Sequence, residues 1–456
     1  MKATYGNIVK KRDAGGAGIN LTLLMAVALI IGGLSIAFTS LSGQRAQTGP
    51  APVVQNASDI LTSGAGTQTG YADRIIASAQ DRVKANPDDY KAYAELGLAF
   101  QQKARETNDP SYYTQAEAAL KEALAIKPDY YDAIAGMGTL NLSLHEFRTA
   151  LDWGLKAQTV IPERAYAYGV VGDAQIELGD YEGAVGSFQR MIDLRPDLGS
   201  YSRVSYAREL YGDVPGAIEA MQQAIRAGSP AAENTAWCRY QLGNLYFNSG
   251  QLDKAEQAYN ESLMGYPDYL HAYAGLAQVR WAQGKTGEAI DLYKQAVATV
   301  PLPQYLTALG DLYTVAGNTE AAKEQYDTVL YIFKVFEAGG VNVDIEKAAF
   351  LAEHDMDIPS AVTMAEAAAA TRQDVNTLDT LAWTYYRAGR YDDAQAAMQK
   401  AMRLGTQNAL FFYHMGMIEK ALGNEAAGQA SIEKALATNP HFSILHARQA
   451  ADLVRR

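Results

Sequence analysis

Residues 163–196, ERAYAYGVVGDAQIELGDYEGAVGSFQRMIDLRP, carry one full copy of a pattern that runs through most of this chain. The copy is 34 residues long, and its last residue, Pro196, stands 34 positions after Pro162. The same step separates Pro267 from Pro301. A fixed period of this length is typical of repeat proteins, in which each copy is one unit of supersecondary structure.

Turn signals divide each copy into two helices. A small residue, here Gly172, is followed seven positions later by Gly179, because glycine can take the left-handed conformation that ends a helix. Asp180 and Glu182 then suit the start of a second helix, and the closing proline stops it. The small residues are Gly97, Gly138, Gly172, Ser205, Gly243, Ala277, Gly310, Ala382 and Gly416. A glycine follows in seven of these nine copies, at Gly179, Gly212, Gly250, Gly284, Gly317, Gly389 and Gly423.

Side-chain size within the second helix also fits close packing. Ala184 leaves room where two helices cross, and Phe188, four positions later, fills the space between the two helices of a copy. One helix pair cannot bury its own apolar face. Stacked pairs bury a continuous core and form a superhelix with a concave inner surface.

This pattern resembles the tetratricopeptide repeat family over about residues 71–456. The resemblance implies an all-α fold, a right-handed superhelical solenoid of about ten helix pairs whose first helices line a concave groove. We expect repeats with an N-terminal capping helix over 71–337. A degenerate eighth repeat and two further repeats should follow over 338–442, with a C-terminal capping helix over 443–456.

Three departures from the pattern predict local irregularities. His145 stands where a glycine is expected, so this turn should be strained or differently shaped. An insertion, RETNDPSYY at 105–113, interrupts the first copy. The stretch YDTVLYIFKVFEAGG at 326–340 reads as an overlong second helix ended by its two glycines. We therefore expect a kink or joint near 338–345.

The N-terminal region has the composition of a membrane anchor. Residues 1–18 form a short arm with four basic side chains and one acidic, and residues 19–41 contain no charge. As a helix, this uncharged segment would span about 34 Å, enough for a hydrocarbon core of about 30 Å. The charge bias predicts a single-pass signal anchor with its N-terminus in the cytoplasm and the repeats outside it. Residues 42–70 have the Gly-, Ser-, Thr- and Gln-rich composition of a flexible linker.

The apolar segment has three other interpretations. A cleaved signal peptide is one alternative, with Ser40-Leu41-Ser42 as a weak cleavage site, although such peptides have an apolar region of about 7–15 residues. A lipoprotein anchor needs a cysteine just after the apolar run, and none stands there. A buried core helix is disfavoured by 23 uncharged residues behind a basic flank.

Composition excludes several classes of protein. The chain is 48% hydrophobic and 20% charged, so it can bury a large core, and its single cysteine, Cys238, excludes a disulfide scaffold and a multi-cysteine zinc site. The formal charge of −12 disfavours nucleic-acid binding. Residues 1–70 hold five basic and two acidic side chains, which leaves 34 basic and 49 acidic, a net charge of −15, for the rest.

No catalytic constellation is evident. The chain has no phosphate-binding loop and no dinucleotide fingerprint. His354, Asp355 and Asp357 cluster in sequence, but a polar turn between helices explains them better than a metal site or an acid–base pair. We expect no catalytic or metal-binding residues, no cofactor and no small-molecule substrate, and hence a protein that is not an enzyme.

The groove-facing positions of the first helices carry the functional prediction. In the resembled family these lie six and three residues before the small residue and one and four after it. Copies five and six are rich in aromatic and amide side chains, which supply contact area and hydrogen bonds to a peptide. A second aromatic patch in copies nine and ten includes Trp383, Tyr386 and Tyr413. The predicted partner-binding residues are Trp237, Tyr240, Asn244, Phe247, Asn248, His271, Gln278 and Trp281.

These observations predict a membrane-anchored scaffold or adaptor that binds a protein or peptide partner in its concave groove. Family analogy favours a role in the assembly or maturation of envelope complexes. The lysine-based clamp by which some family members hold a terminal carboxylate is disfavoured, because Tyr240 stands where its lysine would be. The alternative is a cytoplasm-facing regulatory adaptor or holdase chaperone with inverted topology, and an enzyme subunit is a third class.

Overall fold

The computed structural model describes residues 71–455, and every regular element in that range is a helix. The predicted basic arm at 1–18, membrane anchor at 19–41 and linker at 42–70 lie outside the described residues. Between residues 71 and 455, no helix combines the length and the apolar character that a membrane crossing requires.

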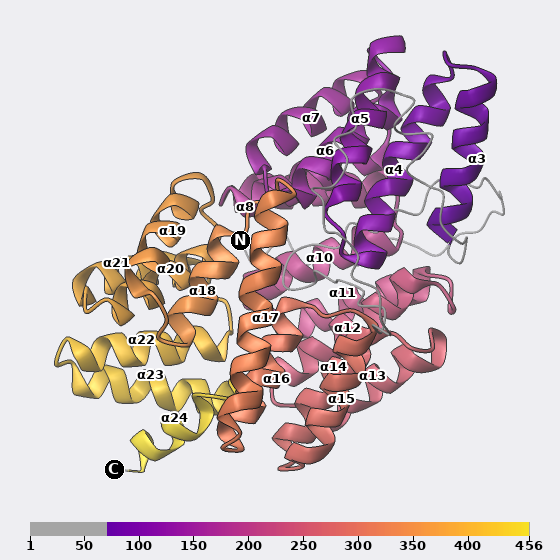
Figure 1. Cartoon of the computed structure of the whole chain (residues 1–456). Coiled ribbons are helices and arrows are strands. Elements are labelled where there is room, and N and C mark those ends of the chain that lie inside the picture. Colours follow the sequence, from indigo (N-terminus) through magenta and orange to yellow (C-terminus); the bar gives the residue numbers. More distant parts are fainter. Residues whose placement is uncertain (1–70, 456) are drawn as a thin grey trace.

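Within residues 71–455, ten antiparallel helix pairs follow one another, each packed on the next, with α3 (Tyr71–Ala85) before them and α24 (Ala447–Val454) after them. Figure 1 shows these pairs winding as a solenoid, which confirms the predicted all-α repeat architecture. Repeats one to five are α4 (Tyr90–Thr107) with α5 (Ser111–Ile126), α6 (Tyr131–Ser143) with α7 (Phe147–Val160), α8 (Ala165–Glu177) with α9 (Tyr181–Leu194), α10 (Leu198–Leu210) with α11 (Val214–Ala227), and α12 (Glu233–Asn248) with α13 (Leu252–Gly265). Repeats six to ten are α14 (Leu270–Ala282) with α15 (Thr286–Thr299), α16 (Pro303–Val315) with α17 (Thr319–Ala338), α18 (Asp344–Glu353) with α19 (Ile358–Thr371), α20 (Val375–Arg387) with α21 (Tyr391–Ala401), and α22 (Ala409–Ala421) with α23 (Glu425–Thr438).

The turns inside the repeats have the predicted backbone conformation. All seven of the predicted turn glycines have a positive φ, between 74° and 82°. At Gly179 this conformation lets the chain reverse at once, and Asp180 then caps α9 by accepting a hydrogen bond from the backbone N–H of Gly183. His145 adopts the same conformation, with φ of 62°, although its side chain makes that conformation costly. The predicted strain at this turn is confirmed.

The small residue of each first helix makes room for the large residue of the second. A Cβ atom added to Gly172 would overlap the ring of Phe188, and one added to Gly243 would overlap the ring of Tyr259. The ring of Tyr259 is fully buried. The sequence pattern of a small residue followed sixteen positions later by a large one therefore reports direct contact between the two helices of a repeat.

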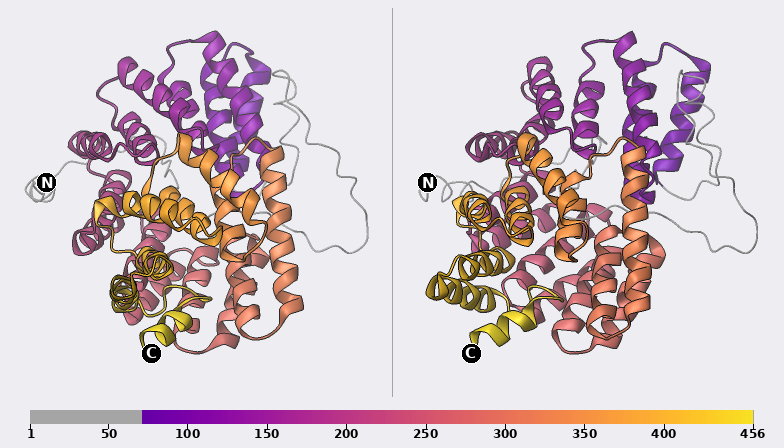
Figure 2. Two further views of the ribbon diagram at one scale, coloured as in Figure 1. Left: turned by 90° about the vertical axis from the view of Figure 1, so that its left-hand side faces the viewer. Right: turned by 60° about the vertical axis from the view of Figure 1, so that its left-hand side comes forward.

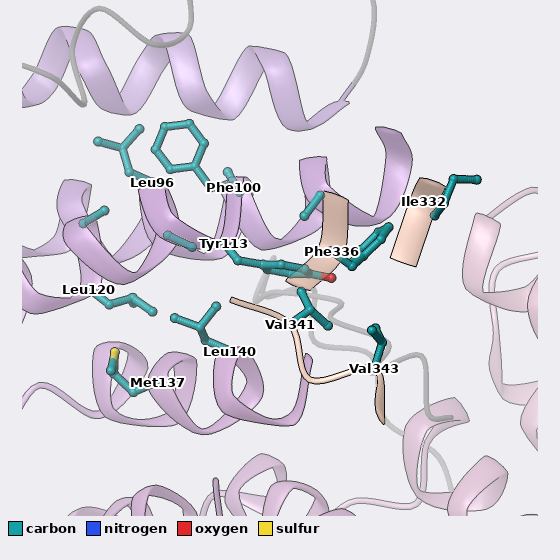
Figure 3. Close-up of a cluster of buried hydrophobic side chains, with 14 of the residues drawn as sticks. Leu96, Phe100, Tyr113, Leu120, Met137, Leu140, Ile332, Phe336, Val341 and Val343 are labelled. Atoms are coloured by element: carbon teal, nitrogen blue, oxygen red, sulfur yellow. The ribbon is translucent and has the colours of Figure 1, made fainter. Parts of the chain in front are cut away.

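The predicted joint after the seventh repeat is also present. Helix α17 is 20 residues long and ends at Gly339–Gly340, and the following α18 has only 10 residues. The extra length of α17 reaches the first repeats, where Phe336 and Val341 share an apolar cluster with Tyr113 and Leu140. Figure 3 shows Tyr113 and Phe336 side by side, with Val341 beneath them in that view.

Beyond this joint the superhelix packs against itself. The turn inside a repeat meets the loop that follows the repeat five places further on, and this contact recurs at successive repeats. In both views of Figure 2 the orange and yellow helices α18–α24 lie alongside the magenta helices. The contacts are Asn342 N to Leu144 O at 3.3 Å, Gln373 N to Glu177 O at 3.0 Å, Thr406 Oγ1 to Leu210 O at 2.5 Å, and the approach of Gly250 to the carbonyl oxygen of Thr438.

One buried ion cluster reinforces this contact between successive turns of the superhelix. The Arg372 guanidinium lies 2.8 Å from the Glu177 carboxylate, 3.0 Å from Asp374 and 3.4 Å from Glu346. Three carboxylates therefore share one cation. Burial raises the pKa of the Glu177 carboxyl above its usual range, although Arg372 opposes this shift.

Candidate functional site

The first helices of repeats five to seven, α12, α14 and α16, present a row of polar side chains. Asn244, Gln278 and Asp311 each stand one position after the small residue of their helix, so they recur at about one-repeat intervals along the array. We call these three residues, together with Tyr240, His271 and Tyr305, the polar wall.

A tyrosine of the second helix holds each member of this row from behind. The Tyr259 hydroxyl donates a hydrogen bond of 2.8 Å to Asn244 Oδ1, and the Tyr326 hydroxyl donates one of 2.8 Å to Asp311 Oδ1. Tyr293 and Gln278 also share a side-chain hydrogen bond. Because these rings are buried between the helices, each hydroxyl fixes one polar side chain of the wall.

Aromatic and imidazole rings lie beside the row of polar side chains. The rings of Tyr240 and His271 are 5.4 Å apart, and His271 Nδ1 lies 2.6 Å from the Tyr305 hydroxyl. That hydroxyl donates in turn to the Tyr240 hydroxyl at 3.5 Å. Burial lowers the pKa of His271 to about 4, so the ring is neutral at pH 7 and the wall around it carries no positive charge.

Four of the eight predicted binding residues lie together, and the other four lie elsewhere. Tyr240, Asn244, His271 and Gln278 come together in the polar wall, as described above. Trp237 is half-buried between two apolar clusters, and Asn248 is exposed at the end of α12.

Two other predicted residues are covered. Phe247 is only 6% exposed and packs with Tyr259 in an apolar cluster, so its ring is closed to a partner in this conformation. Trp281 is half-buried, and the edge of His441 approaches its ring, with centroids 6.0 Å apart. Residue spacing located the first helices correctly but did not reveal which of their rings face the core.

The second aromatic patch is filled by the protein's own side chains. The Trp383 ring is 3% exposed and stacks between Tyr386, at 4.7 Å, and His414, at 4.1 Å. Tyr413 is also buried. This patch is therefore part of the core of repeats nine and ten.

Three histidine–carboxylate pairs within residues 311–446 join different segments of the fold. His354 Nε2 is 2.8 Å from Asp311, which explains why His354 stands in the turn after α18. The other pairs are His414 with Asp379 at 2.9 Å and His446 with Glu353 at 2.8 Å. Within residues 71–455, no group of histidine, cysteine and acidic side chains has the geometry of a metal site.

Sequence reasoning missed Tyr259, Tyr305 and Asp311 as parts of the site. A signal for Tyr259 was present, because a tyrosine follows the small residue by sixteen positions in three successive repeats. Cys238 is buried, and burial raises the pKa of its thiol, which agrees with its interpretation as a packing residue.

Sequence models of the tetratricopeptide repeat match residues 136–198 and 240–305, and a further model of the same repeat matches residues 375–407. The polar wall lies largely within the second of these matches. The matched residues cover parts of repeats two, three, five, six and nine in the structure.

Curated relatives share limited identity with this chain. It is 23% identical over 198 residues to anaphase-promoting complex subunit 7 of Arabidopsis thaliana, covering 43% of this chain and 35% of that protein. It is 25% identical over 244 residues to cellulose synthase 1 operon protein C of Komagataeibacter xylinus, covering 54% and 16%. It is 23% identical over 236 residues to the TPR repeat-containing protein YpiA of Bacillus subtilis, covering 51% and 47%. The chain thus spans less than half the length of each of these relatives.

Some solved structures also share limited similarity with this chain. The human IFIT1 dimer with PPP-AAAA is 14% identical with a TM-score of 0.44, covering 83% of this chain and 94% of that one. YrrB, described as a TPR protein with an unusual peptide-binding site, is 18% identical with a TM-score of 0.28, covering 40% and 92%.

Proposed function

We propose that this array of tetratricopeptide repeats is a scaffold or adaptor that binds a protein or peptide partner on its polar wall, without catalysis. The observation that supports this most directly is the row formed by Asn244, Gln278 and Asp311, held from behind by buried tyrosines. Positions that recur at one-repeat intervals suit a partner that runs along the array.

The wall has the properties that lower the cost of binding. Each amide or carboxylate is already oriented, so less side-chain entropy is lost when a partner binds. Asn244 Oδ1 and Asp311 Oδ1 accept from tyrosine, the Asn244 amide nitrogen donates to Gln241, and Asp311 Oδ1 also contacts His354. The second lone pair of Asn244 Oδ1 and the second oxygen of Asp311 can accept from backbone N–H groups of a partner. The rings of Tyr240 and His271 add apolar contact area beside them.

We also propose that the array is anchored to a membrane through residues 19–41 and faces the extracytoplasmic side. The uncharged segment, its basic flank and the linker at 42–70 support this arrangement. The net charge of −15 on residues 71–456 would keep the array away from anionic lipid. In that place, its partner would be an envelope complex under assembly or maturation. A cytoplasm-facing adaptor or holdase is the alternative.

Crosslinking in living cells tests the binding role. A photoreactive amino acid placed at Gln278 or Tyr240 should capture one protein partner, because both side chains lie on the wall. The same group at Tyr331, 55% exposed on α17, serves as the control and should capture nothing specific. Equal capture from Gln278 and Tyr331 would contradict the assignment of the wall.

A reporter fused after residue 70 tests the topology. Activity of a reporter that works only outside the cytoplasm supports the proposed orientation. Activity of a reporter that works only inside it supports the adaptor alternative.

A further inference from the structure

The segment that joins α23 to α24, residues 440–446, runs between repeats six and seven on one side and repeats eight and ten on the other without forming a helix. In Figure 1 this yellow loop extends from α23 toward α16 and α17 before it returns to α24. We call it the crossing segment. Asn439, which is 2% exposed, fixes its start by accepting a hydrogen bond of 2.9 Å from the backbone N–H of His441.

On one side the crossing segment contacts repeats six and seven. The His441 ring meets Trp281 edge to face, with an interplanar angle of 82°. Ile444 packs against the apolar cluster that contains Leu302 and Tyr305. Trp281 is a predicted partner-binding residue, and the cluster that Ile444 joins contains Tyr305 of the polar wall, so the segment lies against one end of the proposed binding surface.

On the other side the crossing segment contacts repeats eight and ten. The Phe442 ring lies 5.2 Å from the ring of Tyr413, and His446 pairs with Glu353. The two regions of the chain that the sequence marked as aromatic patches therefore lie on opposite sides of one short segment.

The contacts of repeats six and seven with the crossing segment are weak. Within the described part of the chain, no backbone hydrogen bond joins residues 440–446 to α14 or α16. His441, Phe442 and Ile444 each remain partly exposed. An edge-to-face ring pair and one partly buried aliphatic side chain form a contact that a competing chain can displace.

We propose that the crossing segment is an intramolecular stand-in for the partner, and that the partner displaces it with an extended peptide carrying a ring and an aliphatic side chain three residues apart. This inference rests on the proposed function, since it concerns the same wall. A surface covered for part of the time binds its ligand with an apparent affinity reduced by the fraction that is open.

The test uses the full chain and a labelled synthetic peptide, ATNPHFSILHA, which copies residues 437–447. The double variant His441→Ala with Ile444→Ser frees the wall, and we expect it to bind the peptide at least tenfold more tightly than the unmodified protein, by fluorescence anisotropy. Arg448→Ala, at an exposed position on α24, is the matched control and should bind like the unmodified protein. Adding Trp281→Ala to the double variant should abolish the gain. Equal binding by the double variant and the unmodified protein would overturn the inference.

A second measurement leaves the side chains of His441 and Ile444 in place. The variant Ser443→Cys adds one thiol to a chain whose own cysteine, Cys238, is buried, so labelling reports the new site. Excess peptide should accelerate its labelling, and an unchanged rate contradicts displacement. Partner capture from Gln278 that persists alongside these negative results would reject the stand-in role and leave the proposed function intact.

Discussion

Tyr259 links the core of a repeat to its functional surface through one hydroxyl group. Its ring fills the space that Gly243 leaves, and the hydroxyl reaches past the ring to Asn244. The same residue thus explains why a glycine is needed in α12 and why an asparagine is held in place beside it. Packing and binding are coupled at this position, so substitutions in the core change the wall.

Tyr259→Phe keeps the ring and removes the hydrogen bond to Asn244. We expect the free energy of unfolding to fall by about 1 kcal/mol, the typical net contribution of such a bond. Urea denaturation followed by circular dichroism measures this change. Tyr331→Phe, at an exposed ring, is the control and should leave the midpoint unchanged. Equal effects of the two substitutions would show that the hydrogen bond from the Tyr259 hydroxyl does not contribute to the free energy of unfolding.

His271 and His354 should shape the pH dependence of stability in opposite directions. Burial lowers the pKa of His271 from 6.5 to about 4, so its contribution is present above about pH 6.5 and is lost as the pH falls toward 4. Burial also opposes the charged form of His354, but Asp311 outweighs it and raises the pKa of that ring. The contribution of His354 is therefore present below pH 6.5 and is lost as the pH rises through its folded pKa.

Single substitutions separate these two effects. The free energy of unfolding of His271→Gln should depend less on pH between 4 and 6.5 than that of the unmodified protein. His354→Gln should depend less on pH above 6.5. Denaturation series across pH 4–8 measure both, and parallel curves for all three proteins would contradict the assignments.

At the scale of elements, the turns inside the repeats do two different tasks. All of them reverse the chain, but those of the early repeats also meet the loops of later ones. Gly212 and Gly284 have nearly the same φ, 74° and 77°, yet a Cβ atom on Gly212 would overlap the carbonyl oxygen of Gly405, while one on Gly284 has nothing within 4 Å. A comparison of Gly212 with Gly284 therefore separates the energetic cost of the left-handed backbone from that of the contact between superhelical turns.

Gly212→Ala and Gly284→Ala should both lose stability, by about 1 kcal/mol from the left-handed conformation alone. Gly212→Ala should lose more, and amide hydrogen exchange at residues 402–408 should accelerate in it, because the two loops are pushed apart. Exchange in that loop should be unchanged in Gly284→Ala. Matching exchange rates in the two variants would show that the contact between the turns has little energetic weight.

At the scale of the whole molecule, the array is closed by contacts between repeats five or six places apart. Apolar contacts dominate near the joint, where Phe336 packs with Tyr113, while backbone and hydroxyl contacts such as that of Thr406 with Leu210 follow further along. Between them lies the buried cluster around Arg372. The closed form places repeats eight to ten where the crossing segment can reach the polar wall.

Arg372→Ala should destabilise the closed form strongly. It leaves Glu177 and Asp374 buried without their cation, and breaking a buried ion pair in this way typically costs about 3–5 kcal/mol. Small-angle X-ray scattering should show a larger radius of gyration, and urea should unfold repeats eight to ten first. Arg390→Ala removes a pair that is about half exposed on the outer surface and should change neither property. A compact Arg372→Ala protein of normal stability would contradict this role.

The repeat could be recognised from the sequence alone because the features that define it are local. The period of 34 residues, the turn glycines and the pairs of small and large residues all act within one repeat, so Gly179, Phe188 and the long helix ended by Gly339–Gly340 lie where the pattern predicted. Asn244 and Gln278 were recognised for the same reason, since their position in the helix is set locally. The closure of the superhelix, the burial of Phe247 and Trp383, and the path of residues 440–446 were beyond that reading. The closure and the path of residues 440–446 depend on a small rotation between neighbouring repeats that adds up over five copies, and no single copy carries that sum. Phe247 and Trp383 are buried by side chains of their own and the next repeat, such as Tyr259 and His414, so their burial depends on how two neighbouring repeats pack.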